Sequence, residues 1–266
     1  MSQKLIKTTL PSVQFRDHAE LVANRLRHMG HTLLEELTPE DVSLSYFART
    51  AIADQVNPVQ LRLLKAVERS GRTVAITSPG CGIQEACAMV ALHRLVSRRN
   101  RQVLIISPHE FILRRCAQYL KTGQDSSVLL LAETFFSTRT EHAIAADEQL
   151  KWSIRWDPME YASPESLAHA LTGVGTVILD CAHQYTPEFI AALTAAVSPA
   201  QQLLVTGFDV NRGLTLLEHD PLFTTVRAGA HESSLITPAF LMHKRDQYME
   251  LPEVFERLFQ IPFDCG

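Results

Sequence analysis

The sequence lacks the features that would place it in a membrane or in an oxidising compartment. No apolar run approaches the roughly 20 residues that a membrane-spanning helix needs. The first ten residues, MSQKLIKTTL, lack the apolar middle of a secretory signal. The five cysteines are odd in number and form no Cys-x-x-Cys pair, which indicates neither a zinc site nor a disulfide framework. We therefore expect a cytoplasmic protein without a membrane partner.

A large excess of positive charge is also lacking. The formal net charge is −4 over 266 residues, which argues against a protein that coats nucleic acid non-specifically, although a local basic patch remains compatible with binding. The sequence contains no internal repeat, low-complexity tract or long charge run. With 46% hydrophobic residues, the chain is long enough to bury a full core. We expect one large domain or two small ones.

The pattern of apolar residues changes near residue 57. Before it, residues 13–37 carry apolar side chains at helix-like spacing, and residues 38–51 open with a Thr cap followed by Pro. After it, apolar strands are expected over 73–78, 102–107, 127–132, 176–182 and 202–208, and amphipathic helices over 58–71, 85–99, 109–123 and 187–199. Apolar strands that alternate with helices are typical of a parallel sheet with helices on both faces. We predict an N-terminal helical extension over residues 1–56 and an α/β domain over residues 57–266.

The turn after the first of these strands has the layout of a phosphate-binding loop. Ligands of a parallel sheet bind at the carboxyl ends of its strands. A working loop adds a Lys for the β and γ phosphates and a Ser or Thr hydroxyl for magnesium. Here Glu85 stands in the Lys position, Ala86 stands in the hydroxyl position, and Gln84 replaces the last glycine. A carboxylate at this position repels phosphate, so the turn is either a ligand-free connection or an altered site.

Other strand ends carry polar residues as well. Asp180 ends an apolar strand, where nucleotide hydrolases keep a magnesium-binding Asp followed by an acid that polarises water, and Cys181 occupies the place of that acid. A buried thiol is mostly protonated at neutral pH and is a poor base. Upstream, Gln60 is placed where an amide could contact adenine. Asp209 and Asn211 form a polar turn after the last strand.

A Cys/His pair and two tryptophans are less specific indicators of function. Cys181 and His183 lie two residues apart and could form a nucleophile pair, although a buried, hydrogen-bonded pair is the simpler interpretation. Trp152 and Trp156 bracket an expected hairpin or insertion between strands, where they serve core packing or a partner surface.

The order of these segments resembles that of a known group of ATPases. Residues 57–67, 78–86, 102–120, 177–183 and 203–208 follow the order of the Q motif, Walker A, motif Ia, Walker B and coupling motif. That order is similar to the RecA-like ATPases of superfamily-two helicases and of phage terminase large subunits. The helical segment upstream and the tail over 224–263, with its Phe-x-x-x-Phe stretch, make terminase the closer of the two. The resemblance covers about residues 40–262.

The resemblance implies a RecA-like P-loop fold and a nucleotide site with specific roles. By position, Gln60 would contact adenine, Gly80 and Gly82 would shape the loop, and Asp180 would hold magnesium. Because Glu85, Ala86 and Cys181 replace the chemical residues, we expect a catalytically inactive module that takes no cofactor. It would be a structural or regulatory component of phage DNA packaging or processing, in the host cytoplasm if a phage encodes it.

Two alternatives remain open. The first is a divergent but active ATPase or DNA translocase, which binds ATP and magnesium and borrows a cation such as Arg72 or an arginine of a neighbouring subunit. The second is a protein-interaction scaffold that binds neither nucleotide nor DNA. The nuclease domain of the family has no counterpart before the printed sequence ends. We therefore expect a stand-alone protein or a fragment of a longer one, and intact strands beside three lost chemical positions favour the former.

The expected partners follow from the same resemblance. An active terminase-like or helicase-like chain is the expected protein partner. Double-stranded DNA is the other candidate, because basic residues surround motif Ia, where the family follows the nucleic-acid backbone. These residues are Arg98, Arg99, Arg101, Arg114 and Arg115.

Overall fold

The computed structural model describes residues 43–50, 52, 56–97, 102–122, 132, 136, 138–146, 152–158, 163–210 and 212–263. The strands are β1 (Arg72–Thr77), β2 (Gln102–Ile106), β3 (Thr138–Arg139), β4 (Ala143–Ala145), β5 (Ser153–Asp157), β6 (Val174–Leu179), β7 (Gln202–Gly207) and β8 (Thr224–Ala228). The α-helices are α2 (Leu44–Thr50), α3 (Pro58–Arg69), α4 (Ile83–Ser97), α5 (Phe111–Thr122), α7 (Pro164–Ala170), α8 (Pro187–Ala196), α9 (Arg212–Glu218), α10 (Pro238–Gln247) and α11 (Pro252–Phe259). Two short 3-10 helices are η1 (Ala182–Gln184) and η2 (Ala230–Glu232).

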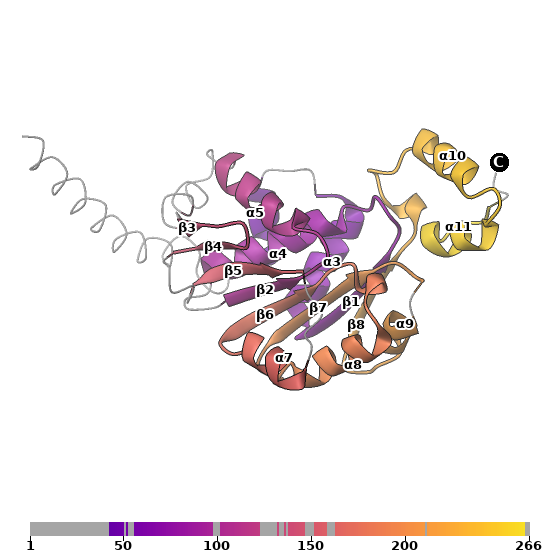
Figure 1. The fold of residues 1–266 in the computed structure, drawn as a ribbon. Coiled ribbons are helices and arrows are strands. Elements are labelled where there is room, and N and C mark those ends of the chain that lie inside the picture. Colours follow the sequence, from indigo (N-terminus) through magenta and orange to yellow (C-terminus); the bar gives the residue numbers. More distant parts are fainter. Residues whose placement is uncertain are drawn as a thin grey trace, which may run out of the picture.

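All of the described strands belong to one sheet, in the order β3-β4-β5-β2-β6-β7-β1-β8 (Figure 1). From β5 to β8, neighbouring strands are parallel, whereas β3 and β4 are added antiparallel at one edge. The carboxyl ends of β1, β2, β6 and β7 therefore lie along one edge of the sheet. This arrangement confirms the predicted parallel α/β fold.

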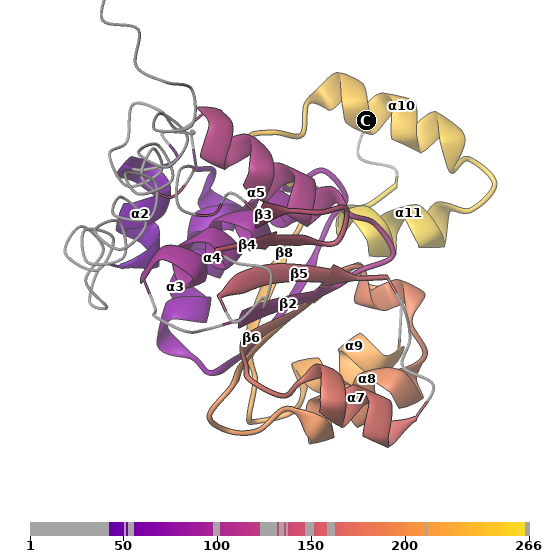
Figure 2. The same ribbon diagram turned by 60° about the vertical axis from the view of Figure 1, so that its left-hand side comes forward.

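Helices cover both faces of the sheet because successive strand residues point to opposite sides. On one face, residues such as Ala75, Ile105 and Leu204 join a core with α2, α3, α4 and α5. On the other face, residues such as Ile76 and Val205 join a core with α7, α8 and α9. Figure 2 shows these two groups of helices on opposite sides of the sheet. The strands read as continuous apolar runs because both of their faces are buried.

Several helices begin where the sequence offers a polar cap followed by proline. The side chains of Asn57, Ser163, Thr186 and Thr237 each accept a hydrogen bond from a backbone N–H in the first turn of α3, α7, α8 and α10. Proline follows in each case and requires no hydrogen-bond acceptor at that position. The predicted helices over 58–71, 85–99, 109–123 and 187–199 are confirmed as α3, α4, α5 and α8.

Between residues 123 and 157 the structure describes β3, β4 and β5, none of which matches a strand predicted from an apolar run. Most of the strand expected over 127–132 lies outside the described residues, and Ala132, at its end, is helical. β2 lies between β6 and β5, and β5 pairs parallel with β2 and antiparallel with β4. Trp152 and Trp156 thus do not bracket a hairpin, because the segment between them is the single strand β5, which extends the central sheet. Trp152 is buried and donates from Nε1 to the Leu95 carbonyl at 2.6 Å, which confirms core packing.

Only the end of the segment predicted as an N-terminal extension is described. Leu44 and Phe47 of α2 are almost fully buried in the core beneath α3 and α4. The Leu44 N–H donates to the Glu68 carboxylate at 3.0 Å. This part of the segment is packed on the α/β domain, and residues 1–42 lie outside the described residues.

The chain ends in a small helical unit, residues 229–263, which we call the C-terminal unit. Its α10 and α11 project beyond the sheet in Figure 1, and a cluster of aromatic side chains holds them together. Phe255 and Phe259 are buried at its centre. The strand and following helix expected over 224–263 correspond to β8 and to two helices rather than one. None of the helices within the described ranges is both long enough and apolar enough to span a membrane.

Stability should depend strongly on α4, which is buried along almost its whole length. Leu92 is 0% exposed, so Leu92→Ala should lower the free energy of unfolding by about 3 kcal/mol through lost burial and a residual cavity. Leu222 is 66% exposed, and Leu222→Ala should change the free energy of unfolding by no more than about 0.5 kcal/mol. Urea unfolding followed by circular dichroism measures both. Equal losses in the two variants would contradict this placement of the core.

Candidate functional site

The glycine turn lies between β1 and α4, at the carboxyl edge of the sheet. Gly80 and Gly82 have φ values of 87° and 73°, a left-handed region that side chains other than glycine rarely adopt. A Cβ at Gly82 would lie 2.5 Å from Gln60 Nε2 and 2.8 Å from Leu235 Cδ1. Both predicted glycines are therefore required for the shape of the turn.

Two amide side chains hold this turn from the start of α3. Asn57 Nδ2 donates to the Cys81 carbonyl at 3.1 Å, and Gln60 Nε2 donates to the Gly82 carbonyl at 2.8 Å. Gln60 Oε1 also accepts from the Asn57 N–H at 3.0 Å, so both ends of its amide are used. Gln60 is 4% exposed and does not line the adjacent cavity. Its contact with adenine remains a prediction, and the structure shows it bracing the turn.

The first turn of α4 retains unpaired backbone donors. The N–H groups of Ile83, Gln84 and Glu85 have no acceptor among the described residues, whereas the Ala86 N–H donates to the Gly82 carbonyl at 3.2 Å. Unpaired N–H groups and the positive end of the helix dipole favour an anion at such a position. The backbone of a phosphate-binding loop is thus present.

The side chains at the two diagnostic positions are those that the sequence predicts, and neither suits a phosphate. Glu85 Oε1 lies 3.8 Å from Arg115 NH2 of α5, so its carboxylate is part of an ion pair between two helices. Ala86 is 0% exposed and faces the core. In place of an ammonium and a hydroxyl, the loop offers a carboxylate and a methyl group.

Asp180, immediately after β6, is surrounded by hydrogen-bond donors. Its Oδ2 accepts from Gln84 Nε2 at 2.7 Å and Ser107 Oγ at 3.2 Å. The same oxygen accepts from Cys181 Sγ at 3.4 Å, and Oδ1 accepts from Thr206 Oγ1 at 2.8 Å. The residue is only 3% exposed. Protein donors thus occupy the carboxylate that the sequence assigns to magnesium, and the magnesium-ligating set of the family does not fit here.

Cys181 has a constrained backbone and a protonated thiol. Its φ of 53° is in the left-handed region, where the chain turns from β6 into η1. Burial, followed by the charge of Asp180, raises the pKa of the thiol well above its usual range. Burial also lowers the pKa of His183, whose Nδ1 accepts from the Phe208 N–H at 3.4 Å. Cys181 and His183 thus face different partners, which gives the nucleophile pair no support.

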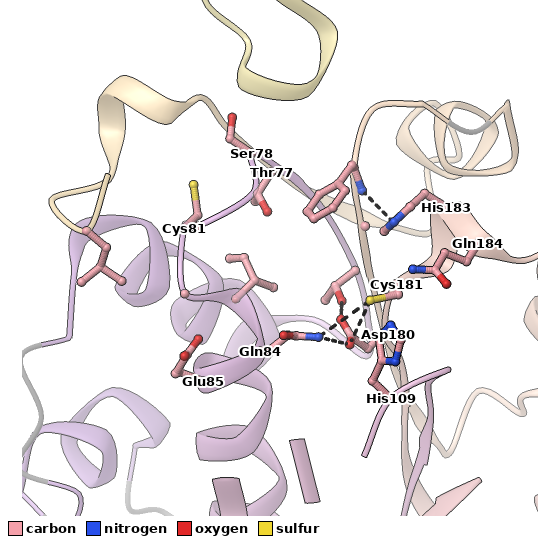
Figure 3. Close-up of a pocket in the computed structure, with 17 residues that line it drawn as sticks. Thr77, Ser78, Cys81, Gln84, Glu85, His109, Asp180, Cys181, His183 and Gln184 are labelled. Atoms are coloured by element: carbon pink, nitrogen blue, oxygen red, sulfur yellow. Dashed lines mark hydrogen bonds between the residues drawn. The ribbon is translucent and has the colours of Figure 1, made fainter. Parts of the chain in front are cut away.

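These groups surround a cavity of about 430 Å³ between the turn and the ends of β1, β6 and β7 (Figure 3). One wall carries His183 stacked on Phe208, with ring centroids 4.4 Å apart. Leu235 of the C-terminal unit also lines it. The lining residues are Thr77, Ser78, Gly80, Cys81, Gly82, Ile83, Gln84, Glu85, His109, Asp180, Cys181, His183, Gln184, Thr206, Gly207, Phe208 and Leu235. Among these described residues there is no Lys or Arg.

The cations that the sequence suggested lie elsewhere or are paired. Arg72 begins β1, six residues and therefore roughly 20 Å from the start of the turn, and donates to the carbonyls of Thr194 and Val197. It cannot serve the turn, so that part of the ATPase alternative is wrong. Arg114 is paired with Glu110 and Arg115 with Glu85. Arg98, Arg99, Arg101 and Asn211 lie outside the described residues.

Other members of the site were not anticipated from the sequence. Ser107 and Thr206 bind Asp180 from the carboxyl ends of their strands, and His109 lines the cavity from the loop before α5. The signal that could have found Ser107 and Thr206 is a hydroxyl at the end of an apolar strand, in LIIS and LLVTG. Asp209 is paired with Arg227 at 2.8 Å and does not line the cavity.

The requirement for glycine in the turn can be tested by substitution. Gly82→Ala should lower the free energy of unfolding by about 2 kcal/mol, because the left-handed φ and the contacts with Gln60 and Leu235 both oppose a methyl group. Gly71→Ala is the matched control, since a Cβ there meets nothing within 4 Å. Thermal unfolding compares the two variants. A Gly82→Ala variant as stable as the control would show that the turn relaxes freely.

The raised pKa of Cys181 predicts slow alkylation. Since the thiolate is the reactive form, iodoacetamide should label Cys181 more slowly at pH 8 in the folded protein than in urea. Asp180→Asn should speed labelling, because it removes a charge that raises the pKa of the thiol. Peptide mass spectrometry over a pH series follows the rate. Rapid labelling of the unaltered protein at pH 7 would reopen the nucleophile pair with His183.

Comparison with solved structures identifies the architecture. Two structures of the large terminase ATPase domain of Thermus phage P74-26, one of them a mutant, give TM-scores of 0.56 and 0.52 at 19% and 18% identity. These alignments cover 81% and 82% of this chain and 96% and 97% of those chains. A third structure is the large terminase of a thermophilic bacteriophage in complex with ADP. Its TM-score is 0.51 at 10% identity, and the alignment covers 77% of this chain and 52% of that chain. No protein-family model matches the sequence, and no curated protein matches it significantly. The chain has the RecA-like fold of phage large terminase ATPase domains.

Proposed function

We propose that this chain is a terminase-like RecA module that does not hydrolyse ATP and acts as a structural or regulatory component of a phage DNA-packaging or DNA-processing assembly. The observation that carries the proposal is the charge of the cavity. Its described lining contains the carboxylates of Glu85 and Asp180 and no Lys or Arg. The fold shared with large terminase ATPase domains supports the assembly in which we place it.

The charge of the cavity opposes a nucleotide triphosphate. A phosphate at the start of α4 would gain from the unpaired N–H groups, yet it would lie beside Glu85, where the family has an ammonium. At a separation of about 4 Å and an intermediate dielectric, reversing that charge turns an attraction of several kcal/mol into a repulsion. The similar terminase of the thermophilic bacteriophage is described in complex with ADP. We expect this chain to bind such a ligand weakly at most.

Hydrolysis meets a second obstacle. The group in the position of the catalytic acid is the Cys181 thiol, whose pKa is raised by burial and by Asp180. A thiol that stays protonated at neutral pH cannot accept a proton from water. The adjacent Asp180 carboxylate is occupied by donors from four residues of the protein, Gln84, Ser107, Cys181 and Thr206. Turnover would require all of these groups to rearrange.

The described surface favours a protein partner over DNA. On the helix that matches motif Ia, the arginines are already paired. Arg114 and Arg115 would have to leave their carboxylate partners before contacting phosphates. The C-terminal unit, in contrast, exposes large apolar side chains at Leu235, Met242, Met249 and Leu251. Exposed apolar surface suits association with another protein. An active terminase-like chain is our proposed partner, and DNA contact through Arg98, Arg99 and Arg101 remains a prediction.

A cytoplasmic setting is part of the proposal. The four cysteines of the described residues, Cys81, Cys87, Cys116 and Cys181, are all free, and the first three are buried. Free thiols suit a reducing compartment.

The nucleotide prediction can be tested by calorimetry and phosphate release. With ATP and magnesium, the unaltered chain should release no phosphate and give no micromolar binding. Combining Glu85→Lys and Ala86→Ser with Arg115→Gln restores the ammonium and hydroxyl and removes the guanidinium 3.8 Å from Glu85. This triple variant should gain measurable ATP binding, because the loop backbone is already shaped for phosphate. We choose Ser because Ala86 is fully buried and Ser adds only one oxygen.

The control is Glu188→Lys, which makes the same charge change in the first turn of α8. It should leave nucleotide binding unchanged. Phosphate release or micromolar affinity in the unaltered chain would overturn the proposed function. An unresponsive triple variant would show that the turn can no longer accept phosphate.

A further inference from the structure

The Gln84 side chain extends from the first turn of α4 across the cavity to Asp180 (Figure 3). Its Nε2 donates to Asp180 Oδ2 at 2.7 Å and lies 3.7 Å from Cys181 Sγ. The first contact joins the glycine turn to the carboxyl end of β6, two parts of the chain separated by 96 positions. In the sequence, Gln84 stands where the family motif has its last glycine, which has no side chain.

Both carboxylate oxygens of Asp180 accept hydrogen bonds from the protein, and Oδ2 receives three of the four. A carboxylate offers about four lone-pair sites. Gln84, Ser107 and Cys181 donate to Oδ2, and Thr206 donates to Oδ1. Of these donors, Ser107, Cys181 and Thr206 come from strand ends or from the turn after β6, whereas Gln84 comes from the loop side. A cation between the loop and Asp180 would therefore compete first with the Gln84 amide.

We infer that the Gln84 amide takes the place of a metal cation at Asp180, and that it holds the glycine turn and α4 against the ends of β6 and β7. We call the hydrogen bond from Gln84 to Asp180 the latch. A primary amide presents partial positive charge to the carboxylate in a charge-assisted hydrogen bond, without bringing an ion into the cavity. The inference deepens the proposed function and rests on it, because a chain that turned over magnesium and ATP would have to release this contact in each cycle.

The latch complements the two amides on the other side of the turn. Asn57 and Gln60 hold the carbonyls of Cys81 and Gly82, and Gln84 holds the start of α4 against Asp180. The turn is thus fixed on two sides by side chains of the protein. A loop that depends on a ligand for its shape would not need these contacts, so the folded turn should be independent of nucleotide and metal.

Binding of Mn²⁺ in the absence of nucleotide tests the inference. Gln84→Glu puts a second carboxylate against Asp180, and two facing carboxylates favour a divalent cation. We expect no Mn²⁺ binding at millimolar concentration by the unaltered chain in electron paramagnetic resonance titrations. Gln84→Glu should bind Mn²⁺ at least roughly tenfold more tightly, and adding Asp180→Asn to it should abolish that gain.

Gln184→Glu is the matched control, because Gln184 also lines the cavity but has no hydrogen bond to Asp180 among the described contacts. It should not acquire the Asp180-dependent Mn²⁺ binding. In EDTA, Gln84→Glu should melt several degrees below the unaltered chain because of the facing charges, and Mn²⁺ should restore most of the loss.

If Gln84→Glu does not fold, Gln84→Ala keeps the inference testable. It should lower the melting temperature by roughly 3–8 °C, because one charge-assisted hydrogen bond is lost, and should allow weak Mn²⁺ binding that Asp180→Asn removes. Asp180-dependent Mn²⁺ binding by the unaltered chain, or identical behaviour of Gln84→Glu and Gln184→Glu, would overturn the inference. Neither result requires ATP, so phosphate release by the unaltered chain would separately overturn the proposed function.

Discussion

The structure depends on a buried carboxylate that must be neutralised locally. Asp180 is 3% exposed, and an anion removed from water is stable only if hydrogen bonds replace its hydration. Ser107 reaches it from the end of β2, Thr206 from β7 and Gln84 from α4. The need to satisfy one side chain therefore aligns three strand ends and the glycine turn. In a nucleotide hydrolase a cation shares this task, whereas here side chains of the protein carry it.

The glycine turn shows how a ligand-binding backbone can be kept while its ligand chemistry is replaced. Gly80 and Gly82 retain their left-handed φ values, and the first N–H groups of α4 remain unpaired in the described structure. The side chains around them, however, are bonded to other groups of the protein. Glu85 faces Arg115, and Gln60 braces Gly82. These contacts explain how the fold of an ATPase domain stays ordered around a cavity that lacks Lys and Arg among its described lining residues.

Much of the fold was readable from the sequence, because strands buried on both faces are continuous apolar runs. β1, β2, β6 and β7 have this pattern, and their order fixed the positions of Asp180 and the glycine turn. Ala132, which is helical, is the one described residue of the run over 127–132, and a short apolar run suits a strand or a buried helix equally well. β5, with Arg155 and Asp157 in its sequence, lacks such a run and was identified only through its pairing with β2.

The sequence also showed which catalytic and phosphate-binding residues of the motifs are absent, but it did not show which contacts the residues in their place would make. Glu85, Ala86 and Cys181 could be recognised as departures from a motif. The ion pair of Glu85 with Arg115 and the hydrogen bond of Gln84 to Asp180 join positions far apart in the chain, and no local pattern predicts such contacts. Gln84 in particular reads in the sequence as a lost glycine, whereas in the structure it is a gained donor.

The central claim is that the turn keeps its shape without a ligand. Hydrogen–deuterium exchange of peptides covering residues 76–90, with and without ATP and magnesium, tests this most directly, because exchange reports local opening of the backbone. The account predicts the same deuterium uptake in both conditions. A marked fall in uptake on adding ATP and magnesium would contradict it, because a ligand would then be ordering the turn.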